Sequence, residues 1–107
     1  MGKILDLSVF EEETLDIRLP EDGSIVRIKK PSQRLVIEML KFKELGENTP
    51  AEQVMEAVNK IVVKILNSND ANKFIDIKYV EDMNLKMKLA IIKAYSEFIT
   101  GVQSNPN

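Results

Sequence analysis

The sequence Asn84-Leu-Lys-Met-Lys-Leu-Ala-Ile-Ile-Lys-Ala-Tyr-Ser-Glu-Phe-Ile-Thr-Gly-Val102 decides how this chain is organised, because it predicts a long helix with an unusually wide apolar surface. At about 100° per residue its apolar side chains cover more than half of the circumference, whereas an ordinary surface helix has a stripe little wider than ~100°. These side chains are Leu85, Met87, Leu89, Ile91, Ile92, Tyr95, Phe98, Ile99 and Val102. The small residues Ala90, Ala94 and Gly101 lie beside a narrow polar strip. We therefore expect this helix to be covered on several sides, by its own chain or by other chains.

A β-hairpin is predicted upstream of the long helix. Residues 14–19 alternate apolar and polar side chains, which is the two-residue period of a half-buried strand. Pro20-Glu-Asp-Gly-Ser24 supplies the residues of a tight turn, and a second strand follows at residues 25–28. Because an isolated hairpin is only marginally stable, its apolar face must lie on helices or pair with the apolar lead-in at residues 4–10, which fits a strand or an extended arm.

Two further helices are predicted between the hairpin and the last helix. The first runs from about Ser32 to Leu45, and Gly46 is expected to end it in a left-handed conformation. The second runs to about Asn67, and Thr49-Pro-Ala-Glu52 predicts a capping box at its start. The expected buried residues are Leu35, Val36, Met39, Leu40 and Phe42 in the first helix and Val54, Met55, Val58, Ile61, Val62, Ile65 and Leu66 in the second. Arg34 and Glu38 are expected to form a weak ion pair, and Val63 to face the polar side.

The segment at residues 74–83 is too mixed in period for a single interpretation. A loop followed by a helical turn at about Tyr79–Met83 is expected, and a strand at residues 74–78 is the alternative. Asn84 is expected to cap the last helix, and residues 103–107 to form a polar tail. The predicted fold is α+β and mostly α: one domain at residues 1–102, in which an N-terminal hairpin packs on three main helices and a short extra helical element.

Composition limits the function classes. The 107 residues are enough for one self-sufficient core, and 44% hydrophobic with 30% charged residues is typical of a globular domain. No stretch approaches the ~18 uninterrupted apolar residues of a membrane span, and the N-terminus lacks the apolar core of a secretory signal. We therefore expect a cytoplasmic protein that does not act in a membrane.

The chain contains few of the residue types that form catalytic and metal sites. With no Cys and no His, the chain has no disulfide, thiolate nucleophile, imidazole base or typical zinc site. The carboxylates at residues 11–13 and the Glu81-Asp82 pair are contiguous in sequence and are expected to be solvated. Asp70, Asn72 and Asp76 lack the glycine and the closing glutamate of a calcium loop. The sequence thus predicts neither an enzyme nor a bound cofactor or metal.

Charge is distributed unevenly along the chain. Residues 1–22 carry seven acidic side chains, and residues 23–43 carry six basic ones against Glu38 alone. Mutual compensation across the hairpin is the simplest interpretation, with a basic docking surface as the alternative. Lys29, Lys30, Arg34, Lys41 and Lys43 would serve a small DNA-binding regulator, although the pI of about 5.2 and the lack of a recognition motif disfavour nucleic acid as a partner.

The layout of the chain resembles that of the tail assembly chaperones of long-tailed, siphovirus-type bacteriophages and prophages of Gram-positive hosts. The resemblance is carried by Ile4-Leu-Asp-Leu-Ser-Val-Phe10, by Arg27-Ile-Lys-Lys-Pro-Ser-Gln33 at the end of the hairpin, by the middle helix, and by Ile91-Ile-Lys-Ala-Tyr-Ser-Glu-Phe-Ile-Thr-Gly-Val102 before Ser104-Asn-Pro-Asn107. It covers nearly the whole chain and concerns pattern and size, since the family has no catalytic signature.

The resemblance implies a small helical protein of the host cytoplasm that is absent from the mature virion. Such a protein coats the hydrophobic tape measure protein, keeps it soluble and transfers it to the growing tail tube. A longer form made by ribosomal frameshifting would recruit the tail tube protein. The classes that stay open beside it are a DNA-binding regulator and a structural tail subunit.

Exposed apolar surface suits a holding protein, and flexible methionines such as Met83 and Met87 suit adaptable contacts. The partner-binding residues predicted here are Ile91, Tyr95, Phe98 and Val102, on the outer part of the last helix. The alternative is that these four residues pack on the two preceding helices. A third interpretation is a homo-oligomer formed through the same face, because Ala90 and Ala94 permit close helix approach.

Overall fold

The structure is a computed structural model that describes residues 3–7, 14–29 and 32–100. This part of the chain forms a small α+β domain with a two-stranded antiparallel hairpin and four helices, and is 54% helical. The elements are β1 (Leu15–Arg18), β2 (Ile25–Ile28), α2 (Gln33–Lys43), α3 (Ala51–Asn67), α4 (Ile77–Glu81) and α5 (Leu85–Thr100). The predicted fold class, a hairpin with three main helices and a short fourth one, is confirmed.

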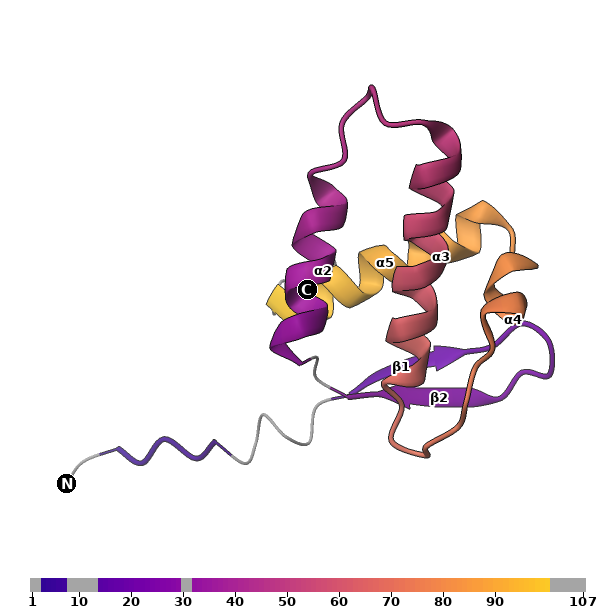
Figure 1. Ribbon diagram of the computed structural model, residues 1–107. Helices are drawn as coiled ribbons and strands as arrows, with labels where there is room; N and C mark the ends of the chain where they lie inside the picture. Colours follow the sequence, from indigo (N-terminus) through magenta and orange to yellow (C-terminus); the bar gives the residue numbers. More distant parts are fainter. Residues whose placement is uncertain (1–2, 8–13, 30–31, 101–107) are drawn as a thin grey trace.

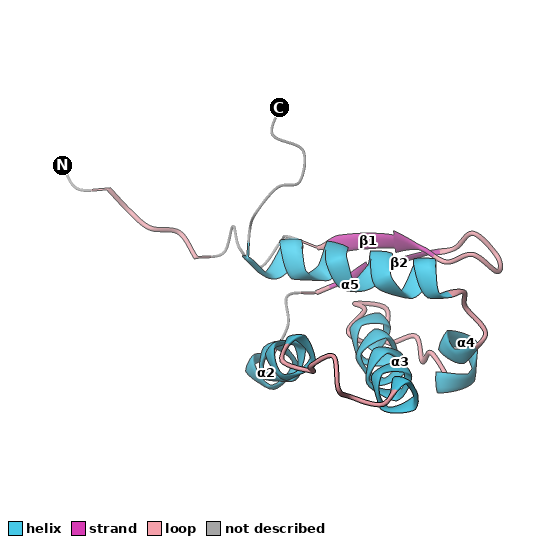
Figure 2. Ribbon diagram, turned by 90° about the horizontal axis from the view of Figure 1, so that it is seen from above, coloured by secondary structure: helices cyan, strands magenta, loops and turns pink. Residues whose placement is uncertain are grey.

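Two layers make up the domain (Figures 1 and 2). One layer contains α5 and the hairpin, with β1 next to α5. The other contains α2, α3 and α4, and the axis of α3 crosses the direction of α5 and the strands. Since α3 contacts α2, α4, α5 and β2, it is the central helix of the domain, a place that the sequence pattern had suggested for the last helix.

The hairpin follows its alternating sequence. Leu15 pairs with Ile28 and Ile17 with Val26, which places these four apolar side chains on the face that packs on the helices. The amide of Leu19 donates to the Ser24 carbonyl at 2.8 Å, and the intervening turn uses a glycine with a φ of +73° at residue 23. The predicted strands, turn and buried face are therefore confirmed.

The core is continuous between the two layers and is richest in residues of α3. Its fully or nearly buried apolar members are Leu19, Val26, Ile28, Leu35, Met39, Val58, Ile61, Val62, Ile65, Leu66, Ile75, Val80, Met83, Ile91, Ile92 and Tyr95. Val63 also packs partly against this core, contrary to the prediction that it faces the polar side, because α3 has neighbours on several sides.

The loop after α3 covers the outer edge of β2. Asn69 forms an isolated antiparallel bridge with Ile28, the Lys29 amide donates to the Ser68 carbonyl at 2.9 Å, and the Asp70 amide donates to the Arg27 carbonyl at 3.0 Å. The Lys29 amide and the Arg27 carbonyl on this edge of the hairpin are thus satisfied by the chain itself.

A buried asparagine organises this loop. The Asn69 side chain is 2% exposed, and it donates to the Leu66 and Lys73 carbonyls at 2.8 and 2.7 Å. Its Oδ1 accepts the amides of Ala71 and Lys73 at 3.1 and 2.8 Å. One side chain therefore satisfies four backbone groups, one carbonyl in the last turn of α3 and three groups in the loop that follows.

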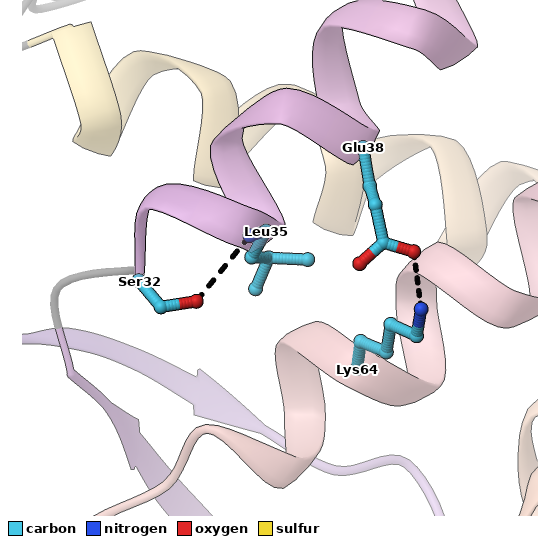
Figure 3. A network of polar contacts seen from close by, with 4 residues as sticks. All are labelled: Ser32, Leu35, Glu38 and Lys64. Atoms are coloured by element: carbon cyan, nitrogen blue, oxygen red, sulfur yellow. Dashed lines mark hydrogen bonds and ion pairs between the residues drawn. The ribbon is translucent and has the colours of Figure 1, made fainter.

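Helix α2 begins where the sequence predicted, but it ends earlier than predicted. The Ser32 hydroxyl accepts the Leu35 amide at 3.3 Å as an N-cap (Figure 3). The helix ends at Lys43 with Glu44 in a right-handed conformation, and among the described residues only Gly23 and Asn72 have a positive φ. The prediction of a left-handed stop at Gly46 was wrong, because the helix ends before reaching the glycine.

The predicted capping box of the next helix was also wrong. Pro50, with extended φ and ψ of −55° and 141°, is the N-cap of α3, and no side chain caps this end. Its carbonyl accepts the amides of Gln53 and Val54. Since the helix begins one residue later than the Thr49 box requires, the two side chains of that box lie out of register with the amides they were expected to cap.

Polar contacts between α2 and α3 replace another predicted pair. Glu38 pairs with Lys64 across the two helices (Figure 3), rather than with Arg34 on its own helix.

Leu40 was expected to be buried, but it is 56% exposed because α2 packs mainly on α3 and leaves its outer side uncovered.

The short element before α5 is helical, so the alternative of a strand at residues 74–78 was wrong. Asp76 caps α4 by accepting the Lys78 amide at 3.2 Å, and the helix lies two residues earlier than expected. Asn84 caps α5, since its Oδ1 accepts the Met87 amide at 2.9 Å, as predicted. The predicted polar tail lies outside the described residues.

Candidate functional site

The structure places the four predicted partner-binding residues in different surroundings. Ile91 is 9% and Tyr95 0% exposed, so both belong to the core of the domain. Phe98 is half-buried and packs against that core, and Val102 lies outside the described residues. The prediction that Ile91 and Tyr95 lie on an outer surface was wrong, because α3 and β1 cover the side of α5 that carries them.

Other residues of α5 are the exposed ones. Leu85, Met87 and Leu89 are 45%, 40% and 46% exposed, on the two flanks of the buried arc. They are part of the wide apolar pattern of the sequence. The neighbouring residues in the chain do not show which members of that pattern are buried and which are exposed. We call these three the exposed α5 residues.

A groove of about 330 Å³ runs between β1 and α5. On one side its wall is the continuous stretch Leu15–Pro20. On the other side are residues of α5 and of the segment before it, namely Met83, Met87, Ala90, Ile91 and Ala94. We call this the β1–α5 groove. Because consecutive residues of a strand point to opposite faces, a wall made of all four β1 residues and the two that follow indicates that the groove runs along the edge of β1.

Small side chains explain why the groove is open. Ala90 and Ala94 stand one turn apart on the flank of α5 that faces β1, where larger side chains would fill the space. Met83 and Met87 complete this wall with unbranched, flexible chains that adapt to different shapes. The small residues noted in the sequence thus mark the groove, although the pattern alone did not identify what would lie opposite them.

The rim of the groove carries charge of both signs. On β1, the Thr14 hydroxyl donates to Asp16 at 3.0 Å, and Arg18 donates to the Gly23 carbonyl at 3.3 Å. On α5, Lys86 and Lys93 are exposed and stand about one turn before and after Ala90. The helix side of the groove is therefore apolar, and Lys86 and Lys93 are not among the residues that line it.

Two side chains with polar groups, Tyr95 and Lys88, lie on the buried side of α5. The Tyr95 hydroxyl has no hydrogen-bond partner in the described part of the chain, and burial raises the pKa of Tyr95 from 10.0 to about 12. Lys88 is 3% exposed, and its Nζ donates to the Glu81 carbonyl at the end of α4 at 3.5 Å. The sequence analysis missed Lys88, yet its spacing from Ile91 and Ile92 places it in the same arc of the helix.

The acidic residues that the sequence analysis considered and did not assign to a site form no cluster in the part that the structure describes. The side chains of Asp70, Asn72, Glu81 and Asp82 are exposed, while Asp76 is used as a helix cap. The described residues contain no group of three or more metal-ligating side chains, and none of their helices has both the length and the apolar character to cross a membrane. Residues 11–13 lie outside the described ranges.

The basic residues proposed for nucleic acid are spread along one segment. Arg34, Lys41 and Lys43 are exposed on α2, Lys29 is exposed at the end of β2, and Lys30 lies outside the described residues. A shallow depression at Arg34, Glu38 and Lys41 also contains an acidic side chain that is paired with α3. The basic segment is thus exposed, and Lys64, which pairs with Glu38, adds a third basic side chain to this depression.

Comparison with known proteins identifies no similar protein. No family model matches this chain, and no curated protein or solved structure is significantly similar to it. Function is therefore inferred from the β1–α5 groove, from the exposed α5 residues and from the sequence pattern.

Proposed function

We propose that this chain is a non-catalytic tail assembly chaperone, which binds an apolar segment of a phage tape measure protein in the host cytoplasm and keeps it soluble for tail tube assembly. One observation carries the proposal: α5 keeps apolar surface exposed on both flanks of its buried arc, Met87 and the β1–α5 groove on one flank and Leu85 and Leu89 on the other, and a second polypeptide can cover this surface. The sequence resemblance supplies the identity of the client.

The energetics of this surface suit temporary binding. Leu85, Met87 and Leu89 already have about half of their area buried, so covering each would contribute about 1 kcal/mol. The sum is well below the roughly 8 kcal/mol of a micromolar complex, and a client must gain the rest from the groove. Contacts of this strength favour an exchangeable complex, which a chaperone needs in order to release its client to the tail tube.

Co-expression with a tape measure fragment tests the proposal. The fragment is expected to be soluble with the unmodified chain and to precipitate with the double variant Leu85→Ser/Leu89→Ser. Loss of two contacts of about 1 kcal/mol each weakens binding by about 30-fold. The matched control is Leu40→Ser, which replaces an even more exposed leucine on another helix, α2, and should leave the fragment soluble.

The outcomes separate the candidate functions. If the fragment stays insoluble with the unmodified chain, or if the double variant protects it as well as the control does, the proposal is wrong. A salt-dependent mobility shift with DNA would instead favour the regulator, because phosphate contacts release counterions. Ordered tubes formed by the chain alone would favour a structural tail subunit.

A further inference from the structure

Exposed apolar side chains lie among basic ones on the outer side of α2. Ile37 and Leu40 are 44% and 56% exposed, and a spacing of three residues places them on the same side of the helix. The charged side chains of this surface are the bases Arg34, Lys41, Lys43 and Lys64 and the acids Glu38 and Glu44. Because Lys64 and Glu38 pair with each other, the charge that remains is positive. We call this surface the basic α2 face.

A second apolar surface lies next to α4. Phe74, in the loop before α4, is 79% exposed and lines a hollow of about 170 Å³ between the β1–β2 turn and α4. The charged residues that line the hollow are Glu21, Asp22, Asp76 and Lys73. Three carboxylates thus outnumber one ammonium group, which donates to the Ser24 hydroxyl at 3.3 Å. We call this surface the acidic α4 hollow.

The two surfaces lie on opposite sides of the domain. In both views α3 lies between α2 and α4 (Figures 1 and 2), and it contacts both of these helices. The β1–β2 turn, which forms part of the hollow, lies at the α4 end. One copy of the chain therefore cannot bring its own basic α2 face to its own acidic α4 hollow, whereas two copies can.

We propose that the basic α2 face of one copy of this chain packs on the acidic α4 hollow of a second copy. The exposed apolar residues Ile37 and Leu40 then cover Phe74, and the bases beside them meet the carboxylates of the hollow. The hollow is smaller than the ~300 Å³ at which pockets for small ligands begin, so it suits a single apolar side chain such as that of Leu40.

Charge selects this pairing of unlike surfaces over a symmetric dimer. In a two-fold dimer each surface meets its own copy. Two α2 faces in contact would bring bases against bases, and two hollows would bring carboxylates against carboxylates, which is strongly unfavourable across an interface. The unlike pairing leaves one basic α2 face and one acidic α4 hollow uncovered at the two ends of each pair. Further copies therefore add in the same way.

Two alanine variants, each altering one surface, test the inference. Leu40→Ala/Lys41→Ala changes the basic α2 face, and Glu21→Ala/Phe74→Ala changes the acidic α4 hollow. All four residues are exposed, so both variants should keep the circular dichroism spectrum and the melting temperature of the unmodified chain.

Sedimentation velocity measures the association. At about 100 μM and low salt, the unmodified chain is expected to form particles larger than a dimer. Each variant should raise the dissociation constant at least about 10-fold, since it loses an apolar contact and a charge. The matched control, Leu89→Ala/Lys93→Ala, removes the same two residue types from exposed positions of α5 and should associate like the unmodified chain.

Mixing the two variants distinguishes unlike from symmetric pairing. The α2 variant keeps an intact hollow, and the hollow variant keeps an intact α2 face. An equimolar mixture is therefore expected to form a 1:1 pair as tightly as the unmodified chain associates, and to stop at two copies. Raising the salt concentration from about 50 to about 500 mM should weaken this pair about 10-fold, because screening reduces the attraction between the two surfaces.

Three results would overturn the inference. They are an unmodified chain that stays monomeric up to about 1 mM, a variant that associates as tightly as the control does, and a mixture that forms no pair. A symmetric dimer gives the second of these results, because one of the two variants would keep the whole of its interface.

This inference goes beyond the proposed function and does not depend on it, since neither surface includes the exposed α5 residues. The client-binding variant Leu85→Ser/Leu89→Ser should still associate, and Leu40→Ala/Lys41→Ala should still protect the tape measure fragment. Association without client protection would refute the chaperone alone, and client protection without association would refute the contact between copies alone.

Discussion

Replacing Tyr95 with phenylalanine is expected to stabilise the folded protein. The tyrosine ring is fully buried, and its hydroxyl has no hydrogen-bond partner in the described part of the chain. Burying a hydroxyl without a partner costs about 1–3 kcal/mol in proteins, and phenylalanine keeps the ring while removing that cost. We expect the free energy of unfolding at pH 7 to rise by about 1 kcal/mol, and the melting temperature by about 4–8 °C.

The stability gained by Tyr95→Phe should be larger in alkaline solution. Burial raises the pKa of Tyr95 from 10.0 to about 12, so the folded state holds the phenolic proton more tightly than the unfolded state. The stability linked to this proton is complete below pH 10 and is lost as the pH rises from 10 to 12. Two pKa units correspond to about 2–3 kcal/mol, about half of which is lost by pH 11. Phenylalanine has no such proton to lose.

Urea unfolding followed by far-UV circular dichroism, at pH 7, 9 and 11, measures both effects as the difference between the two proteins. Taking the difference removes the contribution of the lysines, which both proteins share. Tyr95→Ala is the control for the ring, and it should cost about 3–5 kcal/mol. A phenylalanine variant that is less stable at pH 7, or an advantage that does not grow with pH, would refute this account of Tyr95.

Substitutions at four other residues test local features by urea or thermal unfolding. Asn69→Ala leaves two amides and two carbonyls without their partner and should cost about 2–4 kcal/mol. Asn72→Val forces a β-branched residue to a φ of 56° and should cost about 1–2 kcal/mol, whereas Asn72→Gly should leave stability nearly unchanged. Asn84→Ala removes the cap of α5 and should cost about 1 kcal/mol. Hydrogen bonds from Ser24 lower the pKa of Asp22, so its contribution is complete above its ordinary pKa of 3.8 and is lost as the pH falls. With Asp22→Asn, the free energy of unfolding should therefore depend less on pH in acidic solution.

Predictions that depended on neighbouring residues in the chain succeeded more often than those that depended on distant contacts. The hairpin and the Asn84 cap were correct because alternation, turn residues and a capping side chain act over a few residues. The capping box at Thr49 failed because another local solution, Pro50 as the N-cap, was available. Glu38 was paired with the wrong partner because Lys64, a better-placed cation, lies on another helix.

The candidate site was less accessible to sequence reasoning. A wide apolar arc on α5 was visible, but the buried and exposed members of that arc have the same chemistry. Ile91 and Tyr95 are covered by α3 and β1, while Leu85 and Leu89 are not. Lys88 is buried although it is charged, because its place on the helix faces the end of α4. Only the positions of the neighbouring elements separate these cases.

The sequence by itself determined the fold class, the hairpin, the three main helices and the absence of cysteine and histidine chemistry, because each of these depends on composition or on periodicities within a few residues. The tertiary structure decided which apolar side chains stay in water and where a groove is left beside β1. These properties depend on how distant segments pack, and packing removes some members of an apolar arc from solvent while leaving others of the same kind exposed.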